Sequence, residues 1–231
     1  HTIIEGLWSD YLHMTRDYDK LLERKLAHPS QAFFKTIQKN ISKNPKGFRS
    51  VITCRWIAQK HETCLPSSLA VALSGMKESL DEDLMVKELT YGGTALWRSK
   101  EWLEKRGFHV RHELFSTDIT RALIDAGVPF VIIINSDDSS HAVAVIGYDE
   151  AAGTVILQDP SSERLRHYLK EALIDHETPL GPELLIVVPE NRISAVDAVV
   201  NVESHELLND FHRYWRARED QGVASAQTVL D

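Results

Sequence analysis

The chain has 231 residues, of which 43% are hydrophobic and 26% charged, in the proportions of a soluble globular protein. This length suffices for one large core with appendages. No apolar run is long enough to span a bilayer, no signal peptide is visible, and two cysteines make no disulfide framework. The composition therefore argues against a membrane-spanning protein and a disulfide-stapled scaffold.

The net charge of −8 is unevenly spread. Residues 1–60 hold 11 Lys and Arg against 5 Asp and Glu, whereas residues 61–231 hold 15 against 29. The acidic part argues against a nucleic-acid partner. The basic part fits a solvated helical face, with a contact to an acidic partner or to the rest of a longer parent chain as the alternative. Because the chain starts at His1 and ends at Asp231 in an alanine-rich tail, we expect a piece of a longer, cytoplasmic protein.

The first 47 residues predict two helices. Between residues 3 and 26, apolar side chains recur every three or four positions, at Ile4, Leu7, Tyr11, Met14, Tyr18 and Leu21. His28-Pro29-Ser30 ends this helix and offers a new N-cap. A second helix carries Phe33, Phe34, Ile37 and Ile41, and residues 44–47 close it. We expect residues 1–47 to form a helical hairpin of the kind that builds helical repeats.

The next stretch joins an extended segment to a helix. Residues 48–58 are rich in β-branched and aromatic side chains, which predicts a strand or extended backbone. From Leu65 the apolar residues take helical spacing, and Pro66 suits the first turn of a helix. Cys64 therefore lies at a helix N-terminus, where free N–H groups and the helix dipole favour a thiolate. Gln59 lies five positions upstream with a polar amide.

The remaining chain is mostly strands. Short helices are predicted over 84–89, 96–106 and from a cap at Thr117 or Asp118 through Ala126, with a loop at 91–94. Strands are predicted over 109–115, 129–134, 141–148, 154–158 and 183–188. The helices come first and the strands that follow are mostly antiparallel, so we expect an α+β fold over residues 48–190. Residues 191–231 are predicted to be a linker and C-terminal helices that start a further repeat.

The predicted hairpin 141–159 brings two polar residues together. A turn near Ala151 places His141 opposite or diagonal to Asp159, about 5–8 Å apart at Cβ. Cysteine hydrolases use this arrangement, because the imidazole takes the thiol proton and the acid fixes the imidazole tautomer. Taken singly, a His at a strand entrance and an Asp-Pro turn are ordinary structural features. Their coincidence with Cys64 at a helix start predicts a catalytic constellation.

No metal or cofactor is expected. His61-x-x-Cys64 with a distant histidine resembles a zinc pair, but lone pairs of this kind are usually accidental. Cys54 is interpreted as a buried strand cysteine without a role. A disulfide between Cys54 and Cys64 would need an oxidising compartment, and it would leave Cys64 without the free thiol that a nucleophile needs.

Several motifs together resemble the papain-like family thirty-nine cysteine peptidases, the bacterial double-glycine leader peptidases and their relatives. They are Gln59…Cys64 ahead of a helix, Ser140-His141 through Gly147-Tyr148, and Gln158-Asp159-Pro160. The similarity covers about residues 50–189, and the variant found within tetratricopeptide-repeat proteins is the most similar. The resemblance implies Cys64 as nucleophile, His141 as general base, Asp159 as its orienting partner and Gln59 as oxyanion donor. It also implies a papain-like fold with flanking repeat helices.

The sequence departs from that pattern at the nucleophile. Leader peptidases usually have one more residue between the Gln and the Cys and a Gly directly after the Cys, whereas Leu65 follows Cys64 here. Three functions compete: a hydrolase of peptide or isopeptide bonds, a peptide-binding module without turnover, and an acyltransferase that uses the same thioester. The retained Cys, His and Asp favour the first and third, with a peptide or protein as partner.

Overall fold

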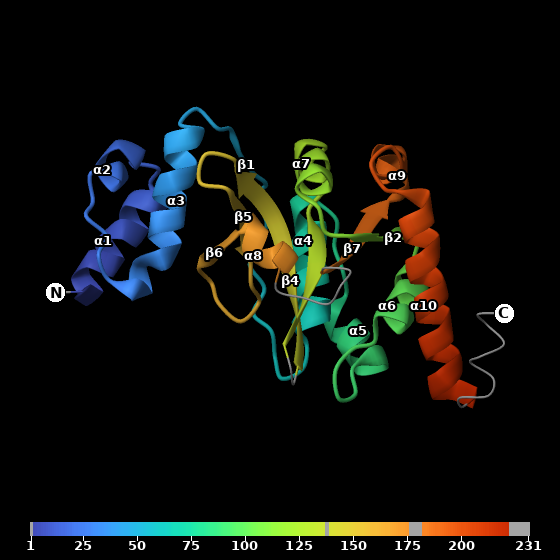
Figure 1. Ribbon diagram of the computed structural model, residues 1–231. Helices are drawn as coiled ribbons and strands as arrows, with labels where there is room; N and C mark the ends of the chain where they lie inside the picture. Colours follow the sequence, from blue (N-terminus) through green and yellow to red (C-terminus); the bar gives the residue numbers. More distant parts are fainter. Residues whose placement is uncertain (1, 137–138, 176–181, 222–231) are drawn as a thin grey trace.

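The computed structural model describes residues 2–136, 139–175 and 182–221 (Figure 1). Its centre is a seven-stranded antiparallel sheet in the order β2-β7-β3-β4-β5-β6, with β1 paired to β4. The strands are β1 Arg49–Val51, β2 Phe108–Leu114, β3 Phe130–Ser136, β4 Ser139–Asp149, β5 Thr154–Gln158, β6 Leu165–Leu169 and β7 Glu183–Pro189. The fold class is α+β, as the sequence predicts.

Helices surround this sheet. The α-helices are α1 Thr2–Met14, α2 Tyr18–Leu22, α3 Ala32–Lys43, α4 Cys64–Gly75, α5 Glu82–Leu89, α6 Leu96–Glu104, α7 Thr117–Asp125, α8 Lys170–Asp175, α9 Ile193–Asp197 and α10 Val202–Gln221. Short 3-10 turns, η1 Pro29–Gln31 and η2 Glu190–Arg192, precede α3 and α9. Figure 1 shows α1, α2 and α3 at one end of the molecule and α10 at the other. None of the helices in the described residues has the length and hydropathy that crossing a bilayer requires.

Most predicted elements are present, and the differences have local causes. The segment predicted at residues 48–58 as a strand or extended backbone is a strand over Arg49–Val51 and continues from there without regular pairing. The helix predicted at 117–126 is capped by Ser116, whose side chain accepts from the Ile119 N–H, rather than by Thr117 or Asp118. Strand β6 and helix α8 were not predicted, because residues 165–175 show no clean apolar alternation.

The single helix predicted over residues 3–26 is wrong. The chain breaks after Met14, and α2 begins at Tyr18 in a new direction. Arg16 has a φ of 57°, a left-handed conformation that interrupts any α-helix. Of the apolar residues at this spacing, Tyr18 and Leu21 are buried in one small cluster, whereas Ile4, Leu7 and Tyr11 are exposed. The periodicity therefore missed the turn, and it marked exposed residues of α1 as well as buried residues of α2.

Two hydrophobic clusters underlie the architecture. The large one joins α4 and α7 to the central strands, with Leu69, Leu73, Phe130 and Ile132 fully buried. The small one gathers side chains of α1, α2 and α3 on Ala151 and Ala152, at the turn between β4 and β5. The division of the chain into residues 1–47, 48–190 and 191–231 stays a prediction.

Candidate active site

Cys64 is the first residue of α4, as predicted from the sequence. The turn before it is closed by Thr63, whose side chain accepts from the Lys60 N–H at 2.8 Å. Glu62 has a φ of 59°, a strained value for a residue other than glycine. This tight turn places the Cys64 thiol at the N-terminus of α4, where backbone N–H groups have no helical partner.

The next residue explains part of the departure from the leader-peptidase pattern. Leu65 occupies the position that usually holds Gly, and its side chain is 3% exposed in the large core cluster. Four residues after Cys64, the Ser68 hydroxyl donates to the Ala142 carbonyl of β4 at 2.9 Å. Leu65 and Ser68 therefore anchor the start of α4 on the strand that carries His141.

His141 and Asp159 meet at the open end of the β4–β5 hairpin. Ala144 pairs with Gln158, which places Asp159 one step further, diagonal to His141 on the same face. A register shift between Val145 and Gly147 sets this relation. The His141 Nε2 atom lies 2.9 Å from Asp159 Oδ1. The contact expected from the hairpin is therefore present.

Asp159 is held by more partners than the sequence suggested. The Ser161 N–H and hydroxyl donate to Oδ1 at 2.8 and 2.7 Å, and Arg166 Nε lies 3.2 Å from Oδ2. The indole N–H of Trp56 donates to the backbone carbonyl of Asp159 at 3.3 Å. Ser161 follows an Asp-Pro turn, a common place for such a hydrogen bond, and this signal was available in the sequence. Arg166 and Trp56 come from distant positions and could not be found without the fold.

The Cys64 thiol and the His141 ring interact, and the interaction shifts the pKa of each group toward its charged form. The Nε2 atom of the ring is the one that contacts Asp159. Burial alone would raise the pKa of Cys64. Hydrogen bonds from His141 and from the Ala142 and Leu65 backbone outweigh burial, so the pKa of Cys64 is lowered.

The other two groups are shifted in the sense that stabilises an ion pair. The hydrogen bond to Cys64, opposed by burial and aided by Asp159, raises the pKa of His141. Burial would raise the pKa of Asp159, but hydrogen bonds from Ser161 and His141 lower it. Each shift favours the charged form of its group, a thiolate at Cys64, an imidazolium at His141 and a carboxylate at Asp159.

Gln59 lies beside this group. Its backbone N–H donates to the Pro160 carbonyl at 3.0 Å, which aligns residues 56–59 with residues 159–160. The side-chain Oε1 atom of Gln59 is buried and has no hydrogen-bond partner in the described part of the chain. A buried polar atom without a hydrogen-bond partner destabilises the folded state unless a ligand or a water molecule bonds to it.

Two other sequence candidates stay apart from the site. Cys54 is half-buried and follows β1 instead of lying in a strand, and burial raises the pKa of its thiol to about 12. Both cysteines are free, so the 54–64 disulfide is absent. His61, the partner in the hypothetical zinc pair, is 91% exposed and lies 3.7 Å from Glu62.

The arrangement of this chain is that of a papain-like α+β protein, with a cysteine at the start of a helix that packs on an antiparallel sheet. A family profile described as "Peptidase_C39 like family" matches residues 51–178, more than half of the chain. The chain belongs to this family. The match contains Gln59, Cys64, His141 and Asp159 and leaves α1–α3 and α10 outside it.

Solved structures are similar in fold. One of them is the peptidase domain of Streptococcus ComA, described as a bi-functional ABC transporter involved in a quorum sensing pathway. The TM-score is 0.50 and the identity 19%, over 60% of this chain and 100% of that one. A search among curated proteins found no match. The tetratricopeptide-repeat variant is not confirmed, because neither match extends the family resemblance to the flanking helices.

Proposed function

We propose that the chain is a cysteine peptidase in which Cys64 is the nucleophile, His141 the general base and acid, Asp159 the orienting carboxylate and Gln59 the oxyanion donor. The observation that carries this proposal is the 2.9 Å contact of His141 Nε2 with Asp159 Oδ1, on a ring that also interacts with the Cys64 thiol. The family match supports peptidase chemistry independently of that geometry.

The chemistry follows from the protonation states. The Cys64 thiolate attacks the carbonyl carbon of a peptide bond, and the negative charge moves to the carbonyl oxygen, which the Gln59 amide and the helix N-terminus stabilise. The tetrahedral intermediate collapses and breaks the C–N bond while the His141 imidazolium gives its proton to the leaving amine. Water then attacks the thioester, with His141 taking its proton, and releases the acid and free Cys64.

Two other functions share these residues. An acyltransferase would pass the same thioester to an amine in place of water. A binding module would keep the cleft without turnover. The lowered pKa of Cys64 favours the two reactive functions over the third, because a binding site needs no thiolate. Membership of the peptidase-like family implies a peptide or protein substrate. The transporter is described for the Streptococcus relative and is not proposed for this chain.

Cleavage of a mixed peptide library, read by mass spectrometry, tests the proposal. We expect new N-termini with the wild type and none with Cys64→Ala. We expect Gln59→Ala to lower the rate by about 100- to 1,000-fold, as removal of an oxyanion donor does. Adding a primary amine separates hydrolysis from transfer, since only transfer gives amide products. Retained cleavage in Cys64→Ala would refute the assignment, and binding of peptides without any covalent intermediate would support the module.

A further inference from the structure

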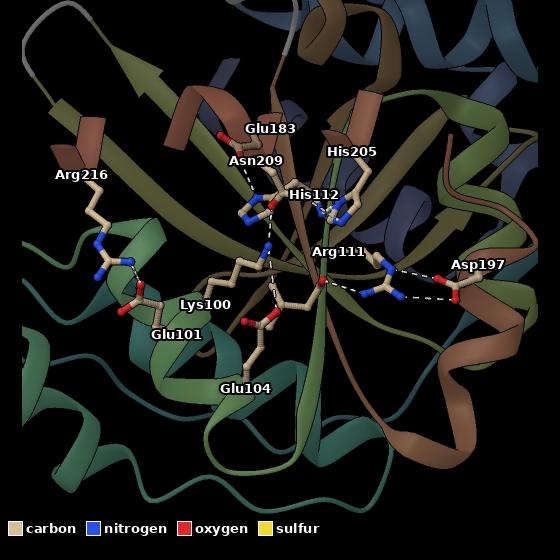
Figure 2. A network of polar contacts seen from close by, with 11 residues as sticks. Lys100, Glu101, Glu104, Arg111, His112, Glu183, Asp197, His205, Asn209 and Arg216 are labelled. Atoms are coloured by element: carbon tan, nitrogen blue, oxygen red, sulfur yellow. Dashed lines mark hydrogen bonds and ion pairs between the residues drawn. The ribbon is translucent and has the colours of Figure 1, made fainter. Parts of the chain in front are cut away.

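A second cluster of titratable side chains lies where α10 packs on β2, away from the candidate active site (Figure 2). It consists of His112 of β2, Glu183 of β7 and His212 of α10. The Nδ1 atom of His112 and the Nε2 atom of His212 each lie 2.6 Å from the same atom, Oε1 of Glu183. Figure 2 shows His112 and Glu183 next to His205 and Asn209, two further residues of α10.

The fold brings the three residues together from three elements. In the antiparallel pair of β2 and β7, His112 is opposite Leu185 and Leu114 is opposite Glu183, so His112 and Glu183 are diagonal neighbours on one face. The helix α10 covers this face and adds His212. The side chains of His112, His212 and Glu183 are 0%, 10% and 16% exposed. The cluster is therefore a built, desolvated site.

The charges around the cluster leave Glu183 without a basic partner. Three cations nearby each have another carboxylate: Arg111 with Asp197, Arg216 with Glu101 and Lys100 with Glu104. In the described ranges no Lys or Arg pairs with Glu183. The side-chain contacts of Glu183 in the described residues are those with His112 and His212.

We infer that His112, Glu183 and His212 bind a divalent transition-metal ion, with Zn²⁺ as the best fit. Two imidazole nitrogens and one carboxylate oxygen are a donor set that zinc uses, and a water completes four ligands. The three ligand atoms already lie within 4.8 Å of one another. Zinc bonds of about 2.0–2.2 Å separate tetrahedral ligand atoms by roughly 3.4 Å, so the ion widens each contact with Glu183 by less than about 1 Å.

The surroundings define what the ion does. The Lys100 ammonium, a cation close to the cluster, donates to Asn209 Oδ1. In the sheet, β2 and β4 are separated by β7 and β3, so the cluster shares no strand with His141. Because its ligands come from two strands and α10, the ion fastens the C-terminal helix to the sheet edge. Its role is structural, outside the proposed peptidase chemistry.

Metal titration of the chelator-treated protein tests this site. All measurements use the Cys64→Ala background, because a thiolate beside His141 is itself a zinc ligand set. We expect one Zn²⁺ per chain by calorimetry, a Co²⁺ absorption spectrum of four- or five-coordinate type, and a higher Tm with Zn²⁺. Glu183→Gln and His212→Gln, which preserve side-chain size, should weaken binding at least about 10-fold. His61→Gln, a matched change at an exposed histidine before α4, should leave binding unchanged.

Hydrogen exchange gives a readout that needs no ligand variant. Zn²⁺ should slow exchange of the backbone amides of residues 202–221 in the Cys64→Ala protein. Absence of binding in that protein, or binding that persists in both Glu183→Gln and His212→Gln, would overturn the inference. The three residues would then be a hydrogen-bonded network that packs α10 without an ion.

Discussion

At the scale of single residues, the two thiols have pKa values displaced in opposite directions. The pKa of Cys64 is lowered, whereas burial raises that of Cys54 to about 12. Limiting iodoacetamide at about pH 6 should therefore label Cys64 much faster than Cys54. His141→Ala should abolish the difference, because it removes the imidazolium that stabilises the thiolate. Mass spectrometry of the labelled peptides measures both rates in one sample.

A denatured control makes this comparison decisive. In denaturant the two cysteines should react at similar rates, which shows that the native difference comes from structure. Equal native labelling, or selectivity that survives His141→Ala, would contradict the thiolate–imidazolium pair.

The second residue-scale prediction concerns the pH profile of cleavage. The hydrogen bond to Cys64 is the largest influence on the pKa of His141 and raises it. Burial lowers this pKa, and Asp159 raises it. In Asp159→Asn the imidazolium loses that support, so the alkaline limb of the rate profile should move to lower pH. The rate at the optimum should fall by about 10- to 100-fold, because the ring is less well held. Lys170→Asn, a change at the start of α8, is the control, and an unshifted alkaline limb in Asp159→Asn would remove Asp159 from the mechanism.

At the scale of elements, the position of α4 on β4 decides whether Cys64 meets His141. Ser68 donates to the Ala142 carbonyl, whereas the neighbouring Ser67 donates to Glu82 of α5. Both serine side chains are buried, so each Ser→Ala change should cost about 1–2 kcal/mol in the free energy of unfolding. Only Ser68→Ala should also slow alkylation of Cys64. Urea unfolding and the labelling rate together test this, and equal labelling rates in both variants would show that this hydrogen bond does not position the thiol.

The antiparallel pairing of β1 with β4 places Gly147 against the β1 backbone. A Cβ added at Gly147 would lie 2.4 Å from the Ser50 carbonyl oxygen, so Gly147→Ala must displace the β1 backbone. We expect a loss of about 1–3 kcal/mol in the free energy of unfolding, as for overpacking. A Cβ added at Gly6 of α1 would point into open space, so Gly6→Ala should be neutral or stabilising by up to about 1 kcal/mol. Denaturant unfolding of the two variants measures the contrast, and similar stabilities would contradict a steric requirement at Gly147.

The elements also show where sequence patterns suffice. Cys64 at a helix start and the His141–Asp159 hairpin follow from local signals, a proline in the first turn and a short loop between two apolar strands. The residues that complete the site do not. Arg166 lies on β6, whose sequence Leu165–Leu169 mixes charged and apolar side chains and gives no strand signal. The break at Arg16 was hidden because the apolar spacing runs on across the turn, although the periodic residues before it are mostly exposed and Tyr18 and Leu21 after it are buried.

The cluster of His112, Glu183 and His212 was missed for a related reason. Its members are separated by 71 and 29 positions in the sequence and match no spacing motif. Only the pairing of β2 with β7 and the docking of α10 bring them together. Sequence patterns predict which residues share one element or one hairpin. The meeting of β2, β7 and α10 depends on the order of the strands in the sheet, which local patterns do not give.

At the scale of the whole molecule, the N-terminal helices are fastened to the turn between β4 and β5. The Tyr18 hydroxyl donates to Asp149 Oδ2 at 2.7 Å, and Arg16 Nε lies 3.3 Å from the same atom. The Asn40 amide donates to the Ala152 carbonyl at 3.0 Å. These polar contacts surround a small apolar cluster, so the docking of α1–α3 depends on relatively few interactions. A charge gained by a buried group at this junction should therefore weaken the docking of α1–α3.

One buried and one half-buried histidine meet at this junction. The rings of His13 on α1 and His167 on β6 are 4.6 Å apart, and the Nε2 atoms of both are buried without partners in the described residues. Burial, partly offset by Asp149 and Asp10 and reinforced by Arg49, lowers the pKa of His13 to about 4. Burial, His13 and Arg49 lower the pKa of His167 to about 3. The folded junction therefore resists protonation that the unfolded chain accepts near pH 6.5.

The free energy of unfolding should consequently fall as the pH drops from 7.5 to 5. For a histidine with a lowered folded-state pKa, the stability is present above the unfolded pKa and is lost as the pH falls toward the folded value. His13→Phe should reduce this loss by roughly 1–2 kcal/mol, because one buried group no longer binds a proton on unfolding. His61→Phe, at an exposed side chain, should leave the pH dependence of the wild type unchanged. Urea unfolding of the three proteins at both pH values measures the effect, and parallel losses in wild type and His13→Phe would show that the His13–His167 junction is not what acid weakens.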